Sequence, residues 1–308
     1  METKDLFLQG GRRNKNGGVL IDAATVILLR DGGEGPYEVF FMRRHGSQSF
    51  MGGAHVFPGG RLDDADADTQ LADCIGGMTA ADARRLLQEP GLSDSSAVGF
   101  FTAAIRETFE EAGVLLARDG SGRPLELADS GTFRRFDSYR LEIHDKLLTM
   151  AELARREHLQ YAADLLIPYS RWITPEIEPR RYDTRFFLAM LPEGQIPAHD
   201  RVELTESCWL TAASALDAHA AGRIVLMPPT LKTVEELAAF SSIDSLFAAA
   251  HAQRICSILP EAFREENGFG VLLSHDSQYT LAGKQPPRPG ETSRIVMEGG
   301  IWKTRPSF

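Results

Sequence analysis

One helix-forming stretch, residues 97–112, constrains this chain more than any other segment. Its apolar residues recur at helical spacing, and Gly113 follows as a stop signal. On a helix, Phe101, Ile105 and Phe109 fall on one side, and three glutamates fall on the other. The stretch therefore predicts an amphipathic helix that packs one face on a core and concentrates negative charge on the opposite face.

The charged face consists of Glu107, Glu110 and Glu111, directly after Arg106. Carboxylates at i, i+3 and i+4 lie above one another and repel, which costs helix stability. A solvated acidic face is the ordinary interpretation of a single pair. Three converging carboxylates also suit a hard divalent cation, Mg²⁺ or Mn²⁺, which takes oxygen ligands and completes its shell with water and substrate phosphate.

A glycine-rich loop, Phe57-Pro58-Gly59-Gly60, precedes this helix. Two glycines after a proline let the backbone turn sharply, approach a ligand and present N–H groups to an anion. Alone, the same four residues would be interpreted as a plain turn.

Composition limits the classes of function. The 308 residues carry a formal net charge of −10, which argues against binding a nucleic-acid backbone but allows one phosphorylated small molecule in a local basic pocket. Cys74, Cys208 and Cys256 have neither metal-ligand nor redox spacing, so a cytoplasmic location is the default expectation. No secretory signal and no run of about 18 apolar residues occurs, so we expect no membrane span.

Periodicity and turn residues predict the other elements. We expect a hairpin of strands 22–30 and 37–44, and a helix over 79–89 with Thr79 as N-cap. The further elements expected are one or two helices in 131–160, strands at 165–173, 184–191 and 208–210, a helix ended by Gly222, a helix over 231–240, and strands within 269–273 and 293–297.

Together, the loop and the helix resemble the Nudix family. The matching residues are Gly60, Arg106, Glu107, Glu110, Glu111, Gly113 and Val114, with Thr108 in place of an apolar residue and Asp66 in place of the upstream glutamate. The spacing differs, because 39 residues separate Asp66 from Arg106 where the family has seven. The Nudix box is therefore split by an insertion, which we expect to be an excursion over residues 61–98 and not a separate domain.

The split box resembles the coenzyme A diphosphatase branch of that family, whose peroxisomal members in mammals have an interrupted box. The resemblance covers about residues 20–245 and includes 49–60, SRWITP (170–175), RRYDTRFF (180–187) and the Pro-Pro-Thr near 229. Of the coenzyme A pattern upstream of the box, Arg44, Gly53, Phe57, Pro58, Gly59 and Gly60 match, whereas His45 and Ser49 depart from it.

The resemblance implies an α/β fold, a Nudix α/β/α sandwich with a mixed sheet. The expected organisation is a flexible arm at 1–18, a Nudix domain at 19–245 with insertion 61–98, and a C-terminal extension of unknown role at 246–308. The implied activity is metal-dependent hydrolysis of a phosphoanhydride, with coenzyme A or acyl-coenzyme A first among substrates. The products would be 3′,5′-ADP and (acyl-)phosphopantetheine. A small nucleotide-linked diphosphate is thus the expected partner, without nucleic acid or membrane, and a homodimer is possible.

The resemblance also implies roles for individual residues. Glu107, Glu110 and Glu111 would hold Mg²⁺ or Mn²⁺, Arg106 would orient a box carboxylate, and Glu206 would add a ligand or base. Substrate would contact Arg44, Gly53, Phe57, Pro58, Gly59, Gly60 and Arg181, since arginine binds phosphate bidentately. The plainer interpretation of each arginine, and of Glu206, is an ordinary surface residue.

Two alternatives remain at this stage. A pyrophosphatase acting on NADH, ADP-ribose or a nucleotide sugar would use the same chemistry on another ligand. A non-catalytic Nudix module that senses a nucleotide is less favoured, because such modules typically lose box glutamates and this chain keeps all three.

Overall fold

A parallel pair of strands, β1 (Leu20–Arg30) and β9 (Arg181–Met190), forms the centre of the main sheet. The computed structural model describes residues 20–33, 36–46, 52–197, 204–265, 268–286 and 290–306. Within these ranges the sheet has eight strands in the order β10-β2-β1-β9-β8-β11, with β3 on β2 and β4 on β1. Antiparallel and parallel neighbours both occur, so the mixed sheet is confirmed.

The other elements surround this pair. The sheet is completed by β2 (Glu38–Arg44), β3 (His55–Val56), β4 (Gly59–Arg61), β8 (Ile167–Ile173), β10 (Leu204–Leu210) and β11 (Ser257–Ile258). The helices are α2 (Thr69–Ala72), α3 (Ala80–Leu87), α4 (Asp94–Ala112), α5 (Ser130–His144), α6 (Met150–Glu157), α7 (Ala212–Ala220), α8 (Pro228–Leu237) and α9 (Ile243–Ala252), with short 3₁₀ turns η1 (Asp64–Ala67) and η2 (Ala163–Leu165). A small sheet joins β5 (Ile75–Gly76), β7 (Gln160–Ala162) and β6 (Ala117–Arg118), and a second joins β12 (Glu261–Glu265), β13 (Gly268–Leu272), β14 (Thr292–Glu298) and β15 (Ile301–Pro306).

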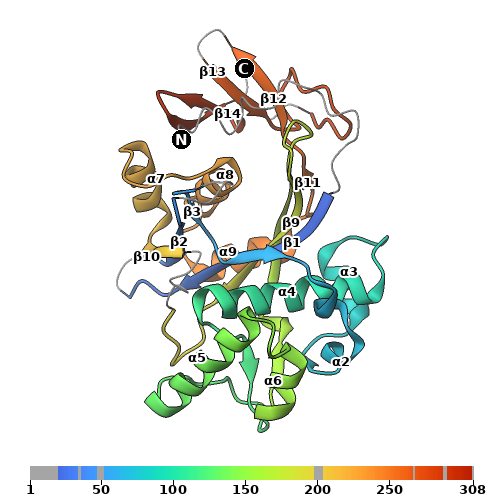
Figure 1. The fold of residues 1–308 in the computed structure, drawn as a ribbon. Coiled ribbons are helices and arrows are strands. Elements are labelled where there is room, and N and C mark those ends of the chain that lie inside the picture. The colour runs from blue at the N-terminus through green and yellow to red at the C-terminus, as the bar shows by residue number, and fades with distance from the viewer. Residues whose placement is uncertain are drawn as a thin grey trace.

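Strand β1 is buried on both faces, so the main sheet forms the middle layer of three. Val26 and Leu28 belong to the apolar core on one face, whereas Ile27 and Leu29 belong to the core on the other. Helices α4, α5 and α6 cover the first face, and α7, α8 and α9 cover the second (Figure 1). The α/β/α sandwich expected from the sequence is therefore confirmed.

The segment between the two halves of the box packs against α4. It forms η1, α2, β5 and α3, and its buried residues Leu71, Ala83 and Leu87 lie in the same apolar core as α4. Thr79 caps α3 as predicted, because its side chain accepts a hydrogen bond from the backbone N–H of Asp82. The insertion thus extends the core beneath the sheet.

A partly buried ionic network joins the end of this segment to the sheet. The Glu89 carboxylate forms ion pairs with Arg171 on β8 at 2.7 Å and with Arg185 on β9 at 2.8 Å. Arg171 also pairs with Asp183 at 2.5 Å, and the guanidinium of Arg185 lies 3.9 Å from the centre of the Phe100 ring of α4. The stretches 170–175 and 180–187 therefore supply the charges that hold the insertion and α4 on the strands.

The C-terminal segment shares the core of the second face. Val271, Leu273 and Trp302 lie in one apolar cluster with α8, and the expected domain boundary at residue 245 falls inside α9, whose Leu246 and Ala250 are buried in that cluster. The His219 side chain on α7 donates from Nε2 to the backbone oxygen of Trp302 at 2.8 Å. A helix of the same core thus runs across residue 245, and the division of the chain there stays a prediction.

Several expected boundaries also move. Helix α4 starts at Asp94, three residues before the prediction, because Ser93 accepts from the backbone of Ser96 as N-cap. Residues 131–160 form two helices, and Lys146 between them has a φ of 59°. Helix α8 starts at Pro228, since proline suits the first helical turn, and β9 and β10 are longer than expected. In the described ranges, no helix has the length and apolarity to cross a bilayer.

Candidate active site

The glycine-rich loop lies directly against the charged face of α4. Gly59 and Gly60 pair with Thr25 and Ala24 of β1. A side chain on Gly59 would come within 2.5 Å of the Ala24 backbone oxygen, and one on Gly60 would collide with the Glu107 carboxylate. The Gly59 N–H also donates to Glu111 Oε2 at 2.8 Å. Only glycine therefore allows this close approach of the loop to the carboxylates.

Arg106 gathers the acidic residues of the box. Its guanidinium forms two bonds of 2.8 Å to Asp66, one from Nε and one from Nη2. Its Nη1 pairs with Glu107 at 2.8 Å and with Glu110 at 2.9 Å. The two halves of the box, far apart in the chain, therefore meet at one arginine. Because the Arg106 side chain is only 11% exposed, it does not form the surface ion pair of the plainer interpretation.

The charges at this site do not balance. Burial, against the opposing effect of Arg106, raises the pKa of Glu107 to about 7, and the neighbouring Glu110 carboxylate acts in the same direction. Burial lowers the pKa of the Arg106 guanidinium, but its bonds to Asp66 and the surrounding carboxylates outweigh this and hold that pKa above its usual value. The single positive charge of Arg106 therefore faces three carboxylates, those of Asp66, Glu107 and Glu110.

A hard divalent cation fits this excess of charge. The donors available are carboxylate oxygens, which Mg²⁺ and Mn²⁺ prefer, and Glu107 and Glu110 have side chains only 12% and 14% exposed, unlike a solvated acidic face. In the part of the chain that the structure describes, no three His, Cys, Asp or Glu side chains stand ready as a formed metal site. The fit consequently rests on donor chemistry and charge.

Arg140 is a residue of this site that sequence reasoning missed. From α5 it donates to the backbone oxygens of Glu110 at 2.7 Å and of Glu111 at 2.8 Å, at the C-terminal end of α4. Nothing in the sequence distinguishes it from the other arginines of 131–160, because only the packing of α5 on α4 brings it there. The unusual Thr108 is buried, and its hydroxyl donates to the Ala104 carbonyl oxygen at 2.7 Å.

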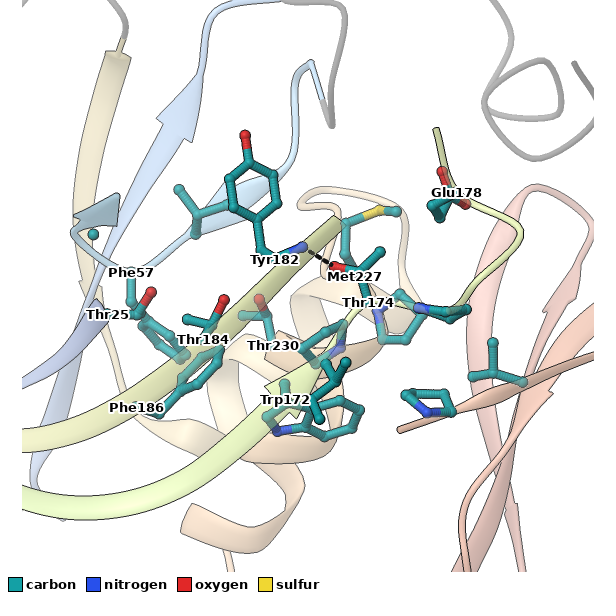
Figure 2. Close-up of a pocket in the computed structure, with 18 of the residues that line it drawn as sticks. Thr25, Phe57, Trp172, Thr174, Glu178, Tyr182, Thr184, Phe186, Met227 and Thr230 are labelled. Carbon is teal, nitrogen blue, oxygen red and sulfur yellow. Dashed lines mark hydrogen bonds between the residues drawn. The ribbon is translucent and has the colours of Figure 1, made fainter. Parts of the chain in front are cut away.

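An apolar cleft opens beside the loop on the other face of the sheet. It has a volume of about 200 Å³, and its lining includes Arg44, Phe57 and Gly59. Figure 2 shows the ring of Trp172 and the side chain of Met227 in its lining, with several threonine hydroxyls. Gly59, whose N–H donates to Glu111, is therefore also part of the cleft lining.

Pro58 and Arg181, two other predicted substrate residues, form hydrogen bonds within the protein, and Gly53 has a positive φ. The Pro58 carbonyl accepts from Val26 N at 2.8 Å, and Arg181 Nε donates to the Thr174 carbonyl oxygen at 3.0 Å. The same threonine accepts from the Tyr182 N–H at 3.0 Å, the bond drawn in Figure 2. Gly53 has a φ of +79°, in the left-handed region that favours glycine.

Glu206 lies on β10, opposite Arg43 of β2. The contact that the structure describes for Glu206 is an exposed ion pair with Arg43 at 3.1 Å. Its role as an additional ligand or base stays a prediction. Glu203, the loop positions 49–51 and the arm at 1–18 lie outside the described residues.

This arrangement of a double-glycine loop, a carboxylate-bearing helix and an arginine clamp on a mixed sheet defines a hydrolase of the Nudix class. The family model described as the NUDT19 Nudix domain matches residues 18–237, and the chain belongs to this Nudix hydrolase family. The match to the family model ends before α9 and the four-stranded sheet.

Similar proteins agree with that assignment. The chain is 30% identical to the "Acyl-coenzyme A diphosphatase NUDT19" of chicken (Gallus gallus), over 85% of this chain and 76% of that protein. It is also 30% identical to the human protein of the same name, over 79% and 72%. Among solved structures, a NUDIX hydrolase from Alicyclobacillus acidocaldarius is similar with a TM-score of 0.62 and 27% identity, covering 76% of this chain and 98% of that one.

Proposed function

We propose that this enzyme hydrolyses the diphosphate of coenzyme A or of its acyl esters, in a reaction that depends on Mg²⁺ or Mn²⁺. Water adds across the phosphoanhydride, and the products are 3′,5′-ADP and phosphopantetheine or its acyl ester. The observation that carries the proposal is the meeting of Gly59 and Gly60 with Glu107 and Glu111 beside an apolar cleft. The names of the chicken and human relatives support the choice of substrate.

The carboxylates have separate supports, which suits a site that must stay in place during turnover. Arg106 fixes Glu107 and Glu110, and the Gly59 N–H fixes Glu111. These three glutamates would hold the cation. When bound there, a divalent cation neutralises diphosphate charge, polarises a phosphoryl oxygen and lowers the pKa of bound water. The residues of the chain supply the position and the negative charge that keep it there.

Arg44 is our candidate for the 3′-phosphate of coenzyme A. It ends strand β2 and lines the same cleft as Gly59. A charge-assisted contact is worth about 1.5–3 kcal/mol, or roughly 10- to 150-fold in kcat/KM. We expect Arg44→Ala to weaken hydrolysis of coenzyme A by this factor and to affect dephospho-coenzyme A much less. An equal loss for both substrates would show that Arg44 does not recognise the 3′-phosphate.

The decisive experiment is a hydrolysis panel with the purified full chain. Coenzyme A, octanoyl-coenzyme A, NADH, ADP-ribose and a nucleotide sugar are each incubated with Mg²⁺ and, separately, with EDTA, and products are identified by mass. We expect 3′,5′-ADP from the coenzyme A compounds only in the presence of metal. Cleavage of NADH, ADP-ribose or the sugar alone would refute the coenzyme A assignment and favour the alternative pyrophosphatase.

A cytoplasmic location and the absence of a nucleic-acid partner remain part of the proposal. They are supported by the net charge of −10 and by three free cysteines. A homodimer also remains a proposal, which sedimentation of the purified chain would test.

A further inference from the structure

The last turn of α4 carries two of the candidate metal ligands, Glu110 and Glu111. The final carbonyl oxygens of a helix have no partners inside the helix, and the final turn is where helices fray. The Gly113 N–H donates to the carbonyl oxygen of Phe109 at 2.9 Å, which is the usual cap of a helix that ends in glycine. The next two carbonyl oxygens along the chain belong to Glu110 and Glu111, so their partners decide how firmly this turn is held.

Arg140 of α5 supplies a partner to each of these two oxygens. Its Nε donates to the Glu110 carbonyl oxygen at 2.7 Å, and its Nη2 donates to that of Glu111 at 2.8 Å. Both lengths are typical of charge-assisted bonds, and a cation is favourable at the C-terminal end of a helix dipole. The ion pair of Arg140 with Asp137 is longer, at 3.9 Å. One guanidinium therefore holds the backbone of two successive ligand residues.

The packing of α5 on α4 fixes the position of that guanidinium (Figure 1). Phe136 and Ile143 are four residues before and three residues after Arg140, so they share its helix face, and both are buried in the same apolar core as α4. The Arg140 side chain is only 8% exposed. Burying a guanidinium costs free energy unless its donors are bonded, so its contacts to the end of α4 also stabilise its own burial.

The same two glutamates are also held at their carboxylates. Glu110 Oε1 accepts from Arg106 Nη1 at 2.9 Å, and Glu111 Oε2 accepts from the Gly59 N–H at 2.8 Å. With Arg140 on the main chain, each of these residues is fixed at its backbone and at its side chain. Groups that orient metal-binding side chains in this way typically set metal affinity, although they do not touch the metal.

We propose that Arg140 is a positioning residue of the metal site: it holds the last turn of α4 so that Glu110 and Glu111 present their carboxylates together to a divalent cation. This inference rests on the proposed function, in which these glutamates hold Mg²⁺ or Mn²⁺. It adds a support from a helix outside the split box. Arg140 acts through the main chain of α4 and not by contact with substrate.

The test compares two arginines of α5 with Arg140→Lys and Arg134→Lys. Lysine keeps the positive charge, but its ammonium group lacks the planar fork that donates to two oxygens at once. We expect Arg140→Lys to raise the Kd of Mn²⁺ about tenfold or more, measured without substrate by electron paramagnetic resonance of free Mn²⁺. At saturating Mn²⁺, kcat should fall about tenfold while KM for coenzyme A stays within about twofold. Arg134 is exposed, so Arg134→Lys should leave all three values as in the wild type.

Arg140→Gln is the second variant, for the case in which Arg140→Lys does not fold. Its amide is shorter and uncharged, so it should weaken Mn²⁺ binding at least as much. The inference is overturned if a folded variant keeps the wild-type Kd for Mn²⁺ and the wild-type kcat. It is also overturned if neither variant folds, because Arg140 would then serve the fold as a whole.

Failure of the proposed function has a different outcome. If the wild type binds no Mn²⁺ and cleaves coenzyme A in EDTA, the proposed metal dependence fails, and the inference fails with it. If the wild type cleaves only a dinucleotide, the coenzyme A assignment fails. The Kd of Mn²⁺ still decides the role of Arg140 in that case, because this measurement needs no substrate.

Discussion

Asp66 and Arg106 lie 40 positions apart in the chain and form a two-armed ion pair, with both N–O distances at 2.8 Å. Asp66 is 1% exposed, and its carboxylate also accepts from the backbone N–H of Asp63 at 2.9 Å. A buried pair of this geometry fixes the orientation of the guanidinium. Since the same guanidinium holds Glu107 and Glu110, the pair determines where the candidate metal ligands point.

We therefore predict that Asp66→Asn destabilises the protein and lowers its activity. Removing one partner of a buried ion pair costs about 3–5 kcal/mol, and the two glutamates that remain on Arg106 should bring the loss toward the lower end. Urea unfolding measures the free energy of unfolding. A lower kcat at saturating Mg²⁺ would indicate that the candidate metal ligands have moved. Asp64→Asn makes the same charge change on the exposed side of η1 and should alter both by little. Equal stability of the two variants would contradict the role of the clamp.

A second prediction concerns the metal. Glu110→Gln removes a charge but keeps the shape of the side chain, so the fold should persist while kcat falls about 100-fold or more. The rise in Tm on adding Mg²⁺ should shrink as well, because a ligand that binds only the folded state stabilises it less when its affinity is lower. Glu193→Gln, on an exposed residue, is the control. Near wild-type turnover of folded Glu110→Gln at saturating Mg²⁺ would reject the assigned role.

The two loop glycines should give different defects when each is changed to alanine. A Cβ at Gly59 meets the backbone of Ala24 and Thr25 within 2.6 Å, so Gly59→Ala should mainly destabilise the fold. A Cβ at Gly60 meets the end of the Glu107 side chain, which can move, so Gly60→Ala should mainly lower kcat. Gly46→Ala, where nothing lies within 4 Å, is the control. Thermal unfolding and kcat measured on all three separate the effects, and identical profiles for the two loop variants would contradict this geometry.

The sequence predicted the local elements of the site and the role of Arg106, but not the contacts that depend on packing between distant segments. The helix around Glu107 and its stop at Gly113 follow from periodicity and from a residue that tolerates positive φ, found here at 68°. The position of Arg140 on the end of α4 depends on helix packing between distant segments, which no local pattern encodes. The cleft wall at Val271 likewise arises only when the C-terminal sheet docks on α8.

The insertion offers a further example and a fourth prediction. Glu89 belongs to no sequence motif, yet its carboxylate forms ion pairs with Arg171 and Arg185. Glu89→Gln would leave Arg185, only 4% exposed, without the charge of one partly buried carboxylate, so stability should fall by about 3 kcal/mol. Conversely, replacing Glu157, whose partner Arg135 is largely exposed, should cost about 1 kcal/mol or less. Chemical unfolding of Glu89→Gln and Glu157→Gln makes the comparison, and a smaller loss for Glu89→Gln would refute the network's role.

The last prediction uses pH to test how the C-terminal sheet is held. Burial by itself raises the pKa of Asp276, but bonds from Arg294, Gln278 N and Ser293 outweigh it and hold that pKa below its usual value. Asp276 is 1% exposed and lies 2.8 Å from Arg294 Nε. A carboxyl with a lowered folded-state pKa stabilises the protein above its unfolded pKa of about 4, and this contribution disappears as pH falls through the folded-state value.

Asp276→Asn should therefore cost about 3 kcal/mol near pH 7, and the difference from the wild type should shrink as the pH falls below about 4. Unfolding free energies measured across pH 2.5–8 test both the size and the sign, with Asp145→Asn, an exposed aspartate, as control. A difference that grows as the solution becomes more acidic would have the opposite sign and would contradict the assignment of Asp276 as an ionised anchor.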